Sequence, residues 1–345
     1  MDDLISILLP YYNAAFSLEG CLDSIIRQSW PSFEVVAVND GSSDDGPVIL
    51  SRYAESDPRI KGFSFNRNKG IVAALNAGLE QCRGDWIARM DADDRMRPDR
   101  LRLQLEYMKS YPDVDILGTR IRLFRFQGAP SPGQIAYQDW SNSLISHSEI
   151  CSNIFAESPI MHPTFFLRKK TYDSLGGYRN RSWPEDYDFL LRAFQENARF
   201  AKLPDVLLDK GDHPRRLARI DQRCKRSPMF QAKAHYFKKK ASLWQRLEHL
   251  MIIGTGSSGK MAWQALDKEG VKIDGFVDHL PASSARHFCG IPVYCLQQEN
   301  ASSFFEQHKG TLFLVCIGLK AGREATENLL QHHGFLPGEG YFRFI

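Results

Sequence analysis

The sequence predicts an α/β protein with a mostly parallel central sheet, followed by a second, smaller α/β unit. Two observations predict the first unit: short apolar runs alternate with segments of helical periodicity, and polar residues follow the runs. A glycine-rich turn that directly follows another apolar run, near residue 250, predicts the second. The length of 345 residues fits two domains, and 43% hydrophobic with 25% charged content is typical of a globular protein.

Apolar runs and helical segments alternate over the first ninety residues. We expect strands at 5–10, 33–38 and 60–65, a further strand that starts at Gly84, and helices at 16–29, at 47–55 and through Ala73, Leu75 and Leu79. This alternation indicates a parallel, doubly wound sheet, in which ligands bind at the carboxyl ends of the strands. Three polar sites follow strands and therefore fall at that edge: Asp40, Asn68 and the pair Asp91/Asp93.

The stretch Gly84–Asp94 is an apolar run that leads into three carboxylates. Side chains alternate along an extended chain, so we expect Asp91 and Asp93 to share one face. Neighbouring carboxylates repel each other unless a cation lies between them. Mg²⁺ or Mn²⁺, held by a few protein oxygens and by substrate phosphates, fits this demand. The alternative is an acidic turn that closes the strand, since Asp is common in turns.

Asp40 ends the second expected strand and begins a turn rich in Gly, Ser and Asp that extends to Gly46. A carboxylate at a strand end, followed by such a turn, suits hydrogen bonding to a nucleotide base or ribose. The alternative is a cap for the next helix, a role that Ser43 or Asp44 could fill as well.

A series of ordered motifs between residues 10 and 188 resembles family 2 glycosyltransferases of the GT-A fold. The matching motifs are Pro10–Asn13, Ser24–Ser29, Val38–Gly46, Asn68–Gly70, Asn76–Gly78, Gly84–Asp85, Arg89–Asp94, His162–Thr164, Gly176–Arg179 and Glu185–Asp188. The resemblance implies that Asp40 contacts the base of a nucleotide-sugar, that Asp91 lies near the ribose and metal, and that Asp93 ligates Mn²⁺ or Mg²⁺. The residues expected to bind the donor nucleotide are Pro10, Tyr12, Asn13, Asp40, Asn68, Gly70, Arg89 and Asp91.

Glu185 and Asp186 precede an amphipathic helix through Phe189, Leu190 and Phe194. Acidic residues at a helix start are favoured by the helix dipole, so capping is one interpretation of the pair. Sugar transfer with inversion, however, needs a base that takes the proton of the acceptor hydroxyl. The resemblance implies that this position supplies the base, so we expect Asp186 to be catalytic, with Glu185 beside it.

His213 stands near the place where members of the resembled family often carry a histidine that approaches the diphosphate or metal. It is a candidate third metal ligand, with a surface-loop histidine as the alternative. Residues 125–148, rich in Gly, Pro, Gln and Ser, are expected to form a mobile loop or lid. The Gln-x-x-Arg-Trp element and the membrane helices of processive synthases are not found in the sequence, which favours transfer of a single sugar over polymerisation.

Positive charge is concentrated between Lys210 and Arg246, where twelve Lys or Arg face two Asp, although the whole chain carries only +3. Such a block could meet anionic lipid head groups, a polyphosphate or nucleic acid, or it could be the solvated face of a linking helix. We expect a transferase domain at 1–213, a basic helical linker at 214–247, and contact with an anionic membrane through 210–246. We expect no nucleic-acid partner.

A second apolar run, Leu250–Ile253, leads into Gly254, Gly256 and Gly259, and a strand at 273–277 ends in Asp278. With the helix expected at 260–266, this is the full context of a Rossmann motif, in which glycines let a phosphate approach a helix N-terminus. Residues 248–345 are too few for a complete dinucleotide fold and resemble the small Rossmann domain of some sugar acyltransferases. We interpret them as a nucleotide-binding or regulatory module; a structural or dimerising domain and a redox domain are the alternatives.

The function that these features predict is inverting, metal-dependent transfer of one sugar from a nucleotide-sugar to a hydroxyl of a glycan or lipid-linked acceptor in surface polysaccharide biosynthesis. UDP is the expected nucleotide, because the position of Asp40 in the resembled family most often reads uracil. The alternatives are a sugar-1-phosphate nucleotidyltransferase and a non-catalytic nucleotide-sugar sensor. Seven scattered cysteines and an acidic N-terminus without a signal peptide lead us to expect a cytoplasmic protein, peripheral at the inner face of the membrane.

Overall fold

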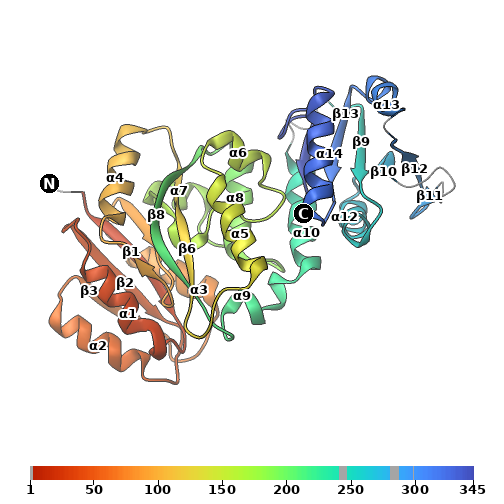
Figure 1. The fold of residues 1–345 in the computed structure, drawn as a ribbon. Helices are drawn as coiled ribbons and strands as arrows, with labels where there is room; N and C mark the ends of the chain where they lie inside the picture. Colours follow the sequence, from red (N-terminus) through yellow and green to blue (C-terminus); the bar gives the residue numbers. More distant parts are fainter. Residues whose placement is uncertain (1–2, 241–246, 280–286, 298) are drawn as a thin grey trace. The chain divides into compact units, whose positions relative to one another are not determined.

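The computed structural model describes residues 3–240, 247–279, 287–297 and 299–345. The chain forms two compact units (Figure 1). The first comprises the residues up to Ile150 together with Ile160–Arg181 and Glu185–Ile220, and the second comprises Cys151–Pro159, Ser182–Pro184 and Asp221–Ile345. In this division, residues 214–220 of the expected linker lie with the first unit and residues 221–240 with the second, while 241–246 lie outside the described residues.

The sheet of the first unit has, within the described residues, the strand order β3-β2-β1-β4-β7-β6-β8-β5. Its strands are β1 (Ile5–Tyr11), β2 (Phe33–Asn39), β3 (Ile60–Ser64), β4 (Trp86–Arg89), β5 (Arg95–Met96), β6 (Ile116–Arg125), β7 (Phe166–Arg168) and β8 (Phe200–Asp212). β1 pairs in parallel with β2 and β4, and β2 pairs in parallel with β3, which confirms the predicted parallel arrangement. β7 is antiparallel to both of its neighbours, β4 and β6.

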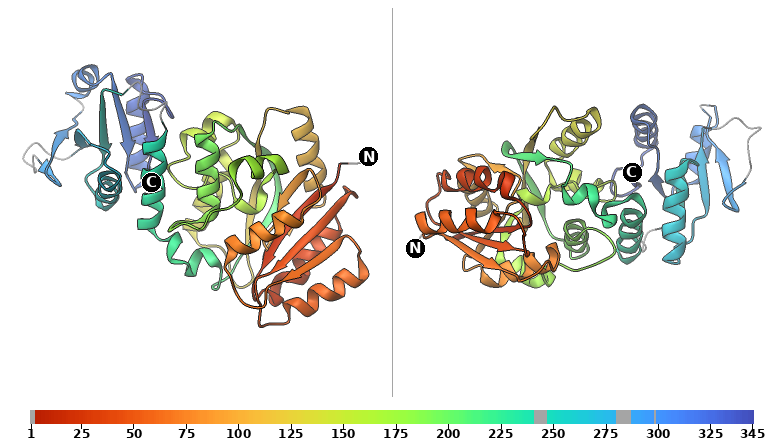
Figure 2. Two further views of the ribbon diagram at one scale, coloured as in Figure 1. Left: turned by 180° about the vertical axis from the view of Figure 1, so that it is seen from behind. Right: turned by 90° about the horizontal axis from the view of Figure 1, so that it is seen from below.

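Helices lie on both faces of this sheet (Figures 1 and 2). Helices α1 (Ala15–Ile26) and α2 (Gly46–Ser56) share a core cluster with alternate residues of β1, such as Ile5 and Ile7. Helix α3 (Ile71–Gln81) covers the other face, so closely that a Cβ at Gly78 would lie 2.3 Å from Leu8 Cδ1. The remaining helices are α4 (Arg100–Ser110), α5 (Pro132–Ser143), α6 (His147–Ser152), η1 (His162–Thr164), α7 (Lys169–Leu175), α8 (Glu185–Gln195) and α9 (Leu217–Ile220).

The loop expected at 125–148 is wrong for much of its length, because α5 occupies its centre, while the role of this segment as a lid stays a prediction. Ser131 accepts a hydrogen bond from the backbone N–H of Gln134, and the Gln134 side chain accepts one from the backbone N–H of Ser131. This capping box, with Pro132 in the first turn, starts a helix in a stretch whose composition alone indicates a loop.

The second unit has its own sheet, whose order among the described residues is β11-β12-β10-β9-β13-β14. Its strands are β9 (His249–Ile253), β10 (Gly275–Asp278), β11 (His287–Phe288), β12 (Ile291–Cys295), β13 (Thr311–Val315) and β14 (Tyr341–Arg343). Its helices are η2 (Gln222–Cys224), α10 (Arg226–Lys239), α12 (Ser257–Lys268), α13 (Ala301–Gln307) and α14 (Lys320–His332). β9 pairs in parallel with β10 and β13, so the predicted Rossmann-like unit is present.

Helix α10 is part of the core of the second unit rather than a solvated linker. Its aromatic residue Phe237 packs edge-to-face against Phe155, with ring centroids 5.6 Å apart. Lys233 is buried and donates from Nζ to the carbonyl oxygens of Ala156 and Phe344, at 2.7 and 3.1 Å. The buried aromatic contacts and the satisfied ammonium group explain why a sequence so rich in Lys and Arg forms an internal helix here.

Several other cations of the basic block are paired inside their own unit. Arg219 forms an ion pair with Asp212 at 2.7 Å, and Arg223 forms one with Asp221 at 2.6 Å. Lys238 and Lys239 are exposed. Across the described ranges, no helix combines the length and the apolar character that crossing a bilayer requires.

Candidate active site

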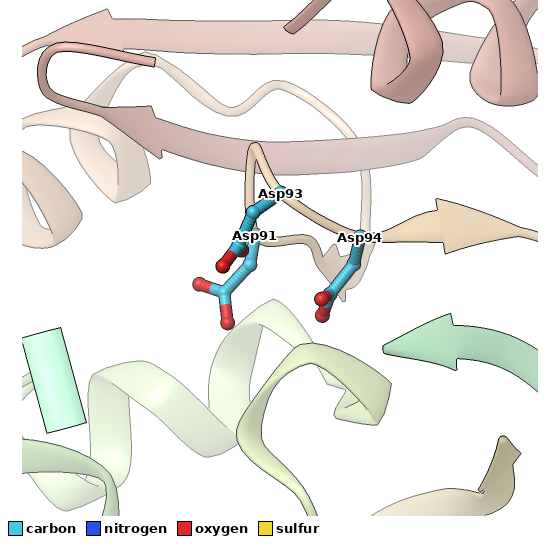
Figure 3. A group of neighbouring side chains, drawn as sticks. All are labelled: Asp91, Asp93 and Asp94. Carbon is cyan, nitrogen blue, oxygen red and sulfur yellow. The ribbon is translucent and has the colours of Figure 1, made fainter. Parts of the chain in front are cut away.

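The chain leaves β4 and turns at the carboxyl edge of the first sheet, where it presents Asp91, Asp93 and Asp94 (Figure 3). One oxygen of each of these three carboxylates lies within 4.8 Å of the others. The backbone N–H of Asp94 donates to Asp91 O at 3.2 Å. A turn therefore brings Asp91 and Asp93 together, which corrects the expectation of alternation along a strand. The turn also adds Asp94, which alternation excludes.

Asp94 is the most deeply buried of the three carboxylates. Its Oδ1 accepts a hydrogen bond from the backbone N–H of Gly211 at 2.8 Å, whereas its buried Oδ2 has no partner among the described residues. Burial, supported by the charges of Asp93 and Asp91, raises the pKa of Asp94 to about 7. An unpartnered buried carboxylate oxygen is costly unless a ligand or cation uses it.

Gly211 permits the close approach of β8 to this turn. A Cβ at Gly211 would lie 2.0 Å from the carbonyl oxygen of Asp93. Because the obstacle is backbone, any side chain at this position would push the two segments apart. The same approach delivers the N–H that binds Asp94.

Three cationic side chains form ion pairs with Asp91 or Asp93: Arg89, Lys210 and Arg216. Arg89 is buried, and its Nη2 lies 2.6 Å from Asp91 Oδ1. Lys210 Nζ lies 4.0 Å from Asp91 Oδ2, and Arg216 contacts Asp91 and Asp93 at 3.4 and 3.6 Å. Burial opposes ionisation of Asp91, but the cations outweigh it and hold the pKa of Asp91 well below its usual range.

His213 lies next to this cluster. Its Nε2 is 3.2 Å from Asp93 Oδ2, and its ring packs edge-to-face against Phe16, with centroids 4.7 Å apart. The residues available to a cation are thus carboxylate oxygens, one imidazole nitrogen and the unpartnered oxygen of Asp94. Mg²⁺ and Mn²⁺ prefer oxygen-rich donor sets of this kind, so the residues present fit a divalent ion.

Asp186 and Glu185 form the first turn of α8. Glu185 is buried, and Asp186 Oδ1 accepts a hydrogen bond from the backbone N–H of Tyr187 at 2.7 Å. Burial raises the pKa of Asp186, while Lys210 and Arg89 act in the opposite direction and Asp91 adds to the rise. Asp186 therefore lies within electrostatic reach of the carboxylate cluster, although almost a hundred residues separate them in the sequence.

Asp40 follows β2 and is buried. Its two carboxylate oxygens accept hydrogen bonds from the backbone N–H groups of Lys69 and Gly70, at 2.7 and 2.9 Å. Asp40 thus fixes the loop that leads into α3, and Gly70 adopts a φ of 89° there. Asn68 is exposed in the same loop. Each carboxylate oxygen retains a lone pair for a ligand.

The stretch that includes Pro10, Tyr12 and Asn13 connects β1 to α1 beside this loop. The backbone N–H of Asn13 donates to Ser42 Oγ, and its side-chain Oδ1 accepts from the backbone N–H of Ser43, both at 2.9 Å. Tyr12 is 50% exposed, which leaves its ring available for stacking on a base. Five of the residues predicted to bind the nucleotide therefore lie in three linked loops: Tyr12, Asn13, Asp40, Asn68 and Gly70. Pro10 lies within β1, and Arg89 and Asp91 lie at the carboxylate cluster.

Charge alone does not predict the parts played by Lys210, Gly211 and Arg216. They belong to a stretch whose composition indicates a basic linker, and only the path of β8 brings them to Asp91–Asp94. His162 is a further buried polar residue near the cluster. Its Nε2 lies 2.7 Å from Tyr178 Oη, and burial followed by the charge of Arg89 holds the pKa of His162 well below its usual range. The motif His162–Thr164 is the sequence feature that could have indicated this residue.

In the second unit, the three glycines of the motif lie between β9 and α12, and they differ in what surrounds them. Gly254 has a φ of 110°, and a Cβ at Gly259 would lie 1.9 Å from Gly254 O, whereas one at Gly256 would meet nothing within 4 Å. Asp278 Oδ2 accepts from the backbone N–H of Thr255 at 2.7 Å and also from its hydroxyl. Asp278 Oδ1 accepts from the backbone N–H of His279 at 2.7 Å.

Comparison with known proteins agrees with the fold. Residues 6–176 match the model of the glycosyl transferase family 2. The amylovoran biosynthesis glycosyltransferase AmsE of Erwinia amylovora is 32% identical over 208 residues, which cover 59% of this chain and 75% of that protein. The chain therefore belongs to the family 2 glycosyltransferases and is an enzyme of that class.

Two further proteins extend the comparison. The UDP-Gal:α-D-GlcNAc-diphosphoundecaprenol β-1,3-galactosyltransferase of Escherichia coli is 31% identical over 210 residues, 59% of this chain and 72% of that protein. The mannosyltransferase PcManGT of Pyrobaculum calidifontis, solved with GDP-Man and Mn²⁺, superposes with a TM-score of 0.50 at 19% identity, covering 70% of this chain and 64% of that one. At this identity the likeness shows the shared fold.

Proposed function

We propose that this glycosyltransferase moves a single sugar, with inversion, from a nucleotide-sugar to a hydroxyl of a glycan or lipid-linked acceptor in surface polysaccharide biosynthesis. One observation carries the proposal: Asp186 lies within electrostatic reach of the carboxylate cluster Asp91–Asp94, and burial raises its pKa. A carboxylate with a raised pKa is a stronger base, and its position beside a divalent-ion site suits proton removal next to a departing diphosphate.

On the donor side, Asp91, Asp93 and His213 would hold Mn²⁺ or Mg²⁺, with Arg89 orienting Asp91. A divalent ion there would stabilise, as a Lewis acid, the negative charge that develops on the departing nucleoside diphosphate. We assign the base and ribose to the three linked loops, where Asp40 and the exposed ring of Tyr12 offer a hydrogen-bond acceptor and a stacking surface.

On the acceptor side, Asp186 takes the proton of the attacking hydroxyl. The acceptor oxygen forms a bond to the anomeric carbon while the bond from that carbon to the diphosphate oxygen breaks on the opposite face. The products are the glycoside and the nucleoside diphosphate, and the single displacement inverts the anomeric centre. Glu185, buried at the start of the same helix, is assigned to positioning.

The proposed donor and acceptor classes are supported by what similar proteins are named for. The Escherichia coli relative is named for a UDP-sugar donor and a diphosphoundecaprenol-linked acceptor, and AmsE for the synthesis of amylovoran. PcManGT was solved with GDP-Man. We therefore propose UDP as the nucleotide of the donor, with GDP as the alternative. Contact with an anionic membrane through 210–246 stays a prediction; the exposed cations in the described part of that stretch include Arg215, Lys225, Lys238 and Lys239.

For the second unit we propose a nucleotide or nucleotide-sugar site at the glycine turn. The open space at Gly256 and the close approach at Gly259 are what a phosphate at the start of α12 requires. A structural or dimerising role is the competing hypothesis, because Asp278 already accepts hydrogen bonds from Thr255 in the glycine turn and from His279.

A thermal-shift screen of UDP- and GDP-sugars with Mn²⁺, followed by measurement of nucleoside diphosphate release, tests the proposal. We expect stabilisation by a UDP-sugar that requires Mn²⁺, and slow UDP release without acceptor. A protein that binds donors but never releases UDP, with or without candidate acceptors, would instead be a sensor.

A further inference from the structure

Arg216 differs from the other two cations of the cluster in how it is held. Arg89 ends β4 and Lys210 lies on β8, so the sheet fixes both backbones. Arg216 lies between β8 and α9, where its backbone N–H donates to His213 O at 3.2 Å in a turn. The carbonyl oxygen of Arg216 accepts from the backbone N–H of Arg219 at 2.9 Å, so a turn rather than the sheet holds the backbone of Arg216.

The guanidinium of Arg216 bridges the two carboxylates of the Asp-x-Asp motif. Its Nη2 lies 3.4 Å from Asp91 Oδ2, and its Nε lies 3.6 Å from Asp93 Oδ2. Both distances exceed those of a strong charge-assisted hydrogen bond, whereas Arg89 binds the other oxygen of Asp91 at 2.6 Å. Arg216 thus binds less closely than Arg89, and it is the cation that contacts both carboxylates, at oxygens that a shared divalent ion would need.

The positive charge of Arg216 affects how a divalent ion can enter the cluster. Arg89, Lys210 and Arg216 already place three positive charges beside the carboxylates of Asp91 and Asp93. A divalent ion that entered alone would add two more positive charges to this largely buried site, which is unfavourable. Entry together with the anionic diphosphate of the donor would offset the added charge. The guanidinium, with its planar fork of donors, matches phosphate oxygens as well as carboxylates.

We propose that Arg216 is a built-in counter-ion that holds Asp91 and Asp93 together before the divalent ion arrives, and that it then transfers its guanidinium to the diphosphate of the donor. Arg216 competes with the metal in the empty enzyme and assists the leaving group in the loaded one. It therefore couples metal binding to nucleotide binding. The inference rests on the proposed metal site, and it adds a residue that affects the order in which the metal and the nucleotide bind.

The neighbouring arginine provides a matched control. Arg215 carries the same charge one residue earlier and is exposed, so its removal changes the net charge of the segment without opening the cluster. Arg216→Lys is the second test variant, because it keeps a cation near the carboxylates but loses the planar fork. Thermal unfolding of each variant confirms that it is folded before binding is compared.

The experiment measures equilibrium binding of Mn²⁺ to the full chain, with the electron paramagnetic resonance of free Mn²⁺ as the signal. Binding is measured first without nucleotide and then with saturating UDP. We expect Arg216→Gln to bind Mn²⁺ alone about tenfold more tightly than the parent protein, while Arg215→Gln and Arg216→Lys change by less than about twofold. With UDP present, the advantage of Arg216→Gln should vanish, because the diphosphate then lacks its partner.

Nucleotide-free Mn²⁺ binding that is unchanged or weaker in Arg216→Gln would overturn the counter-ion role. If that variant does not fold, a parent protein whose Mn²⁺ affinity is the same with and without UDP overturns it as well. Asp93→Ala separates this failure from a failure of the proposed function. Loss of Mn²⁺ binding in Asp93→Ala with no effect of Arg216→Gln rejects only the counter-ion, whereas intact Mn²⁺ binding in Asp93→Ala rejects the metal site itself.

Discussion

Both units place an aspartate where a parallel strand ends, yet the two aspartates are satisfied in different ways. Asp278, at the end of β10, accepts hydrogen bonds from Thr255, in the glycine turn after β9, and from the backbone of His279, so neutral groups complete it. Asp91, after β4, shares a turn with two more carboxylates and depends on cations: Arg89, two residues earlier, and Lys210 and Arg216, more than a hundred residues later. One buried oxygen of Asp94 finds no partner in the described residues.

The difference separates a structural aspartate from a reactive one. A carboxylate whose acceptors are used by neutral N–H and O–H groups adds stability and asks nothing of a ligand. A group of carboxylates that lies against several cations is poised to exchange one of those cations for another. On these grounds we assign the divalent ion and the chemistry to the first unit.

The largest effect is expected in the first unit, where Asp186→Asn should abolish transfer but leave UDP binding intact. The amide keeps the shape and the acceptor for Tyr187 N–H but cannot take a proton, so transfer should fall about 10³-fold or more. UDP affinity should stay within about twofold of the parent protein. Rates of UDP release and UDP titrations measure the two quantities. Asp173→Asn, the same change at an exposed site, is the control, and normal turnover by Asp186→Asn would remove the assignment of the base.

A large effect is also expected from Gly211→Ala, because the added Cβ would lie 2.0 Å from the backbone of Asp93. The displaced turn should lower Mn²⁺-dependent affinity for UDP about 100-fold. Gly133→Ala, where a Cβ meets nothing within 4 Å, should bind as the parent protein does. Equal titrations for both variants would mean that the β8 contact does not shape the site.

A moderate effect on pH dependence is expected from Lys210→Met. Asp186 must be ionised to act, so activity is lost as the pH falls through the pKa of Asp186. Lys210 lowers that pKa against the effect of burial, so its removal should move the acid limb of kcat upward by about one pH unit. The measurement is kcat against pH at saturating donor, with the exposed Lys170→Met as control. An acid limb that stays in place or moves down contradicts the proposed electrostatic link.

The smallest effect is expected in the second unit, from Asp278→Asn. One oxygen remains to accept a hydrogen bond, so the free energy of unfolding should fall by only about 0.5–1.5 kcal/mol. Thermal unfolding measures this change. The contrast between the two aspartates would be broken if Asp278→Asn also removed Mn²⁺-dependent binding of UDP.

The sequence is sufficient to predict the parallel sheets and the edge at which the site lies, because strand periodicity and strand ends are local features. It also identifies Asp91, Asp93 and Asp186 through the order of their motifs. The contributions of Lys210, Gly211 and Arg216 depend on a close approach between β8 and the turn after β4, and this approach has no local signature. The sequence also does not predict the burial of α10, because charged residues dominate the composition of this helix. Its burial depends on aromatic residues of Cys151–Pro159 and of the C-terminal strand.

The most direct test of the central claim is a titration with UDP, in the presence and absence of Mn²⁺, of the parent protein, Asp93→Ala and Asp186→Asn. If the turn after β4 holds the metal and α8 supplies only the base, Mn²⁺ will strengthen UDP binding in the parent protein and in Asp186→Asn but not in Asp93→Ala. An equal response to Mn²⁺ in Asp93→Ala and the parent protein would contradict this division of roles.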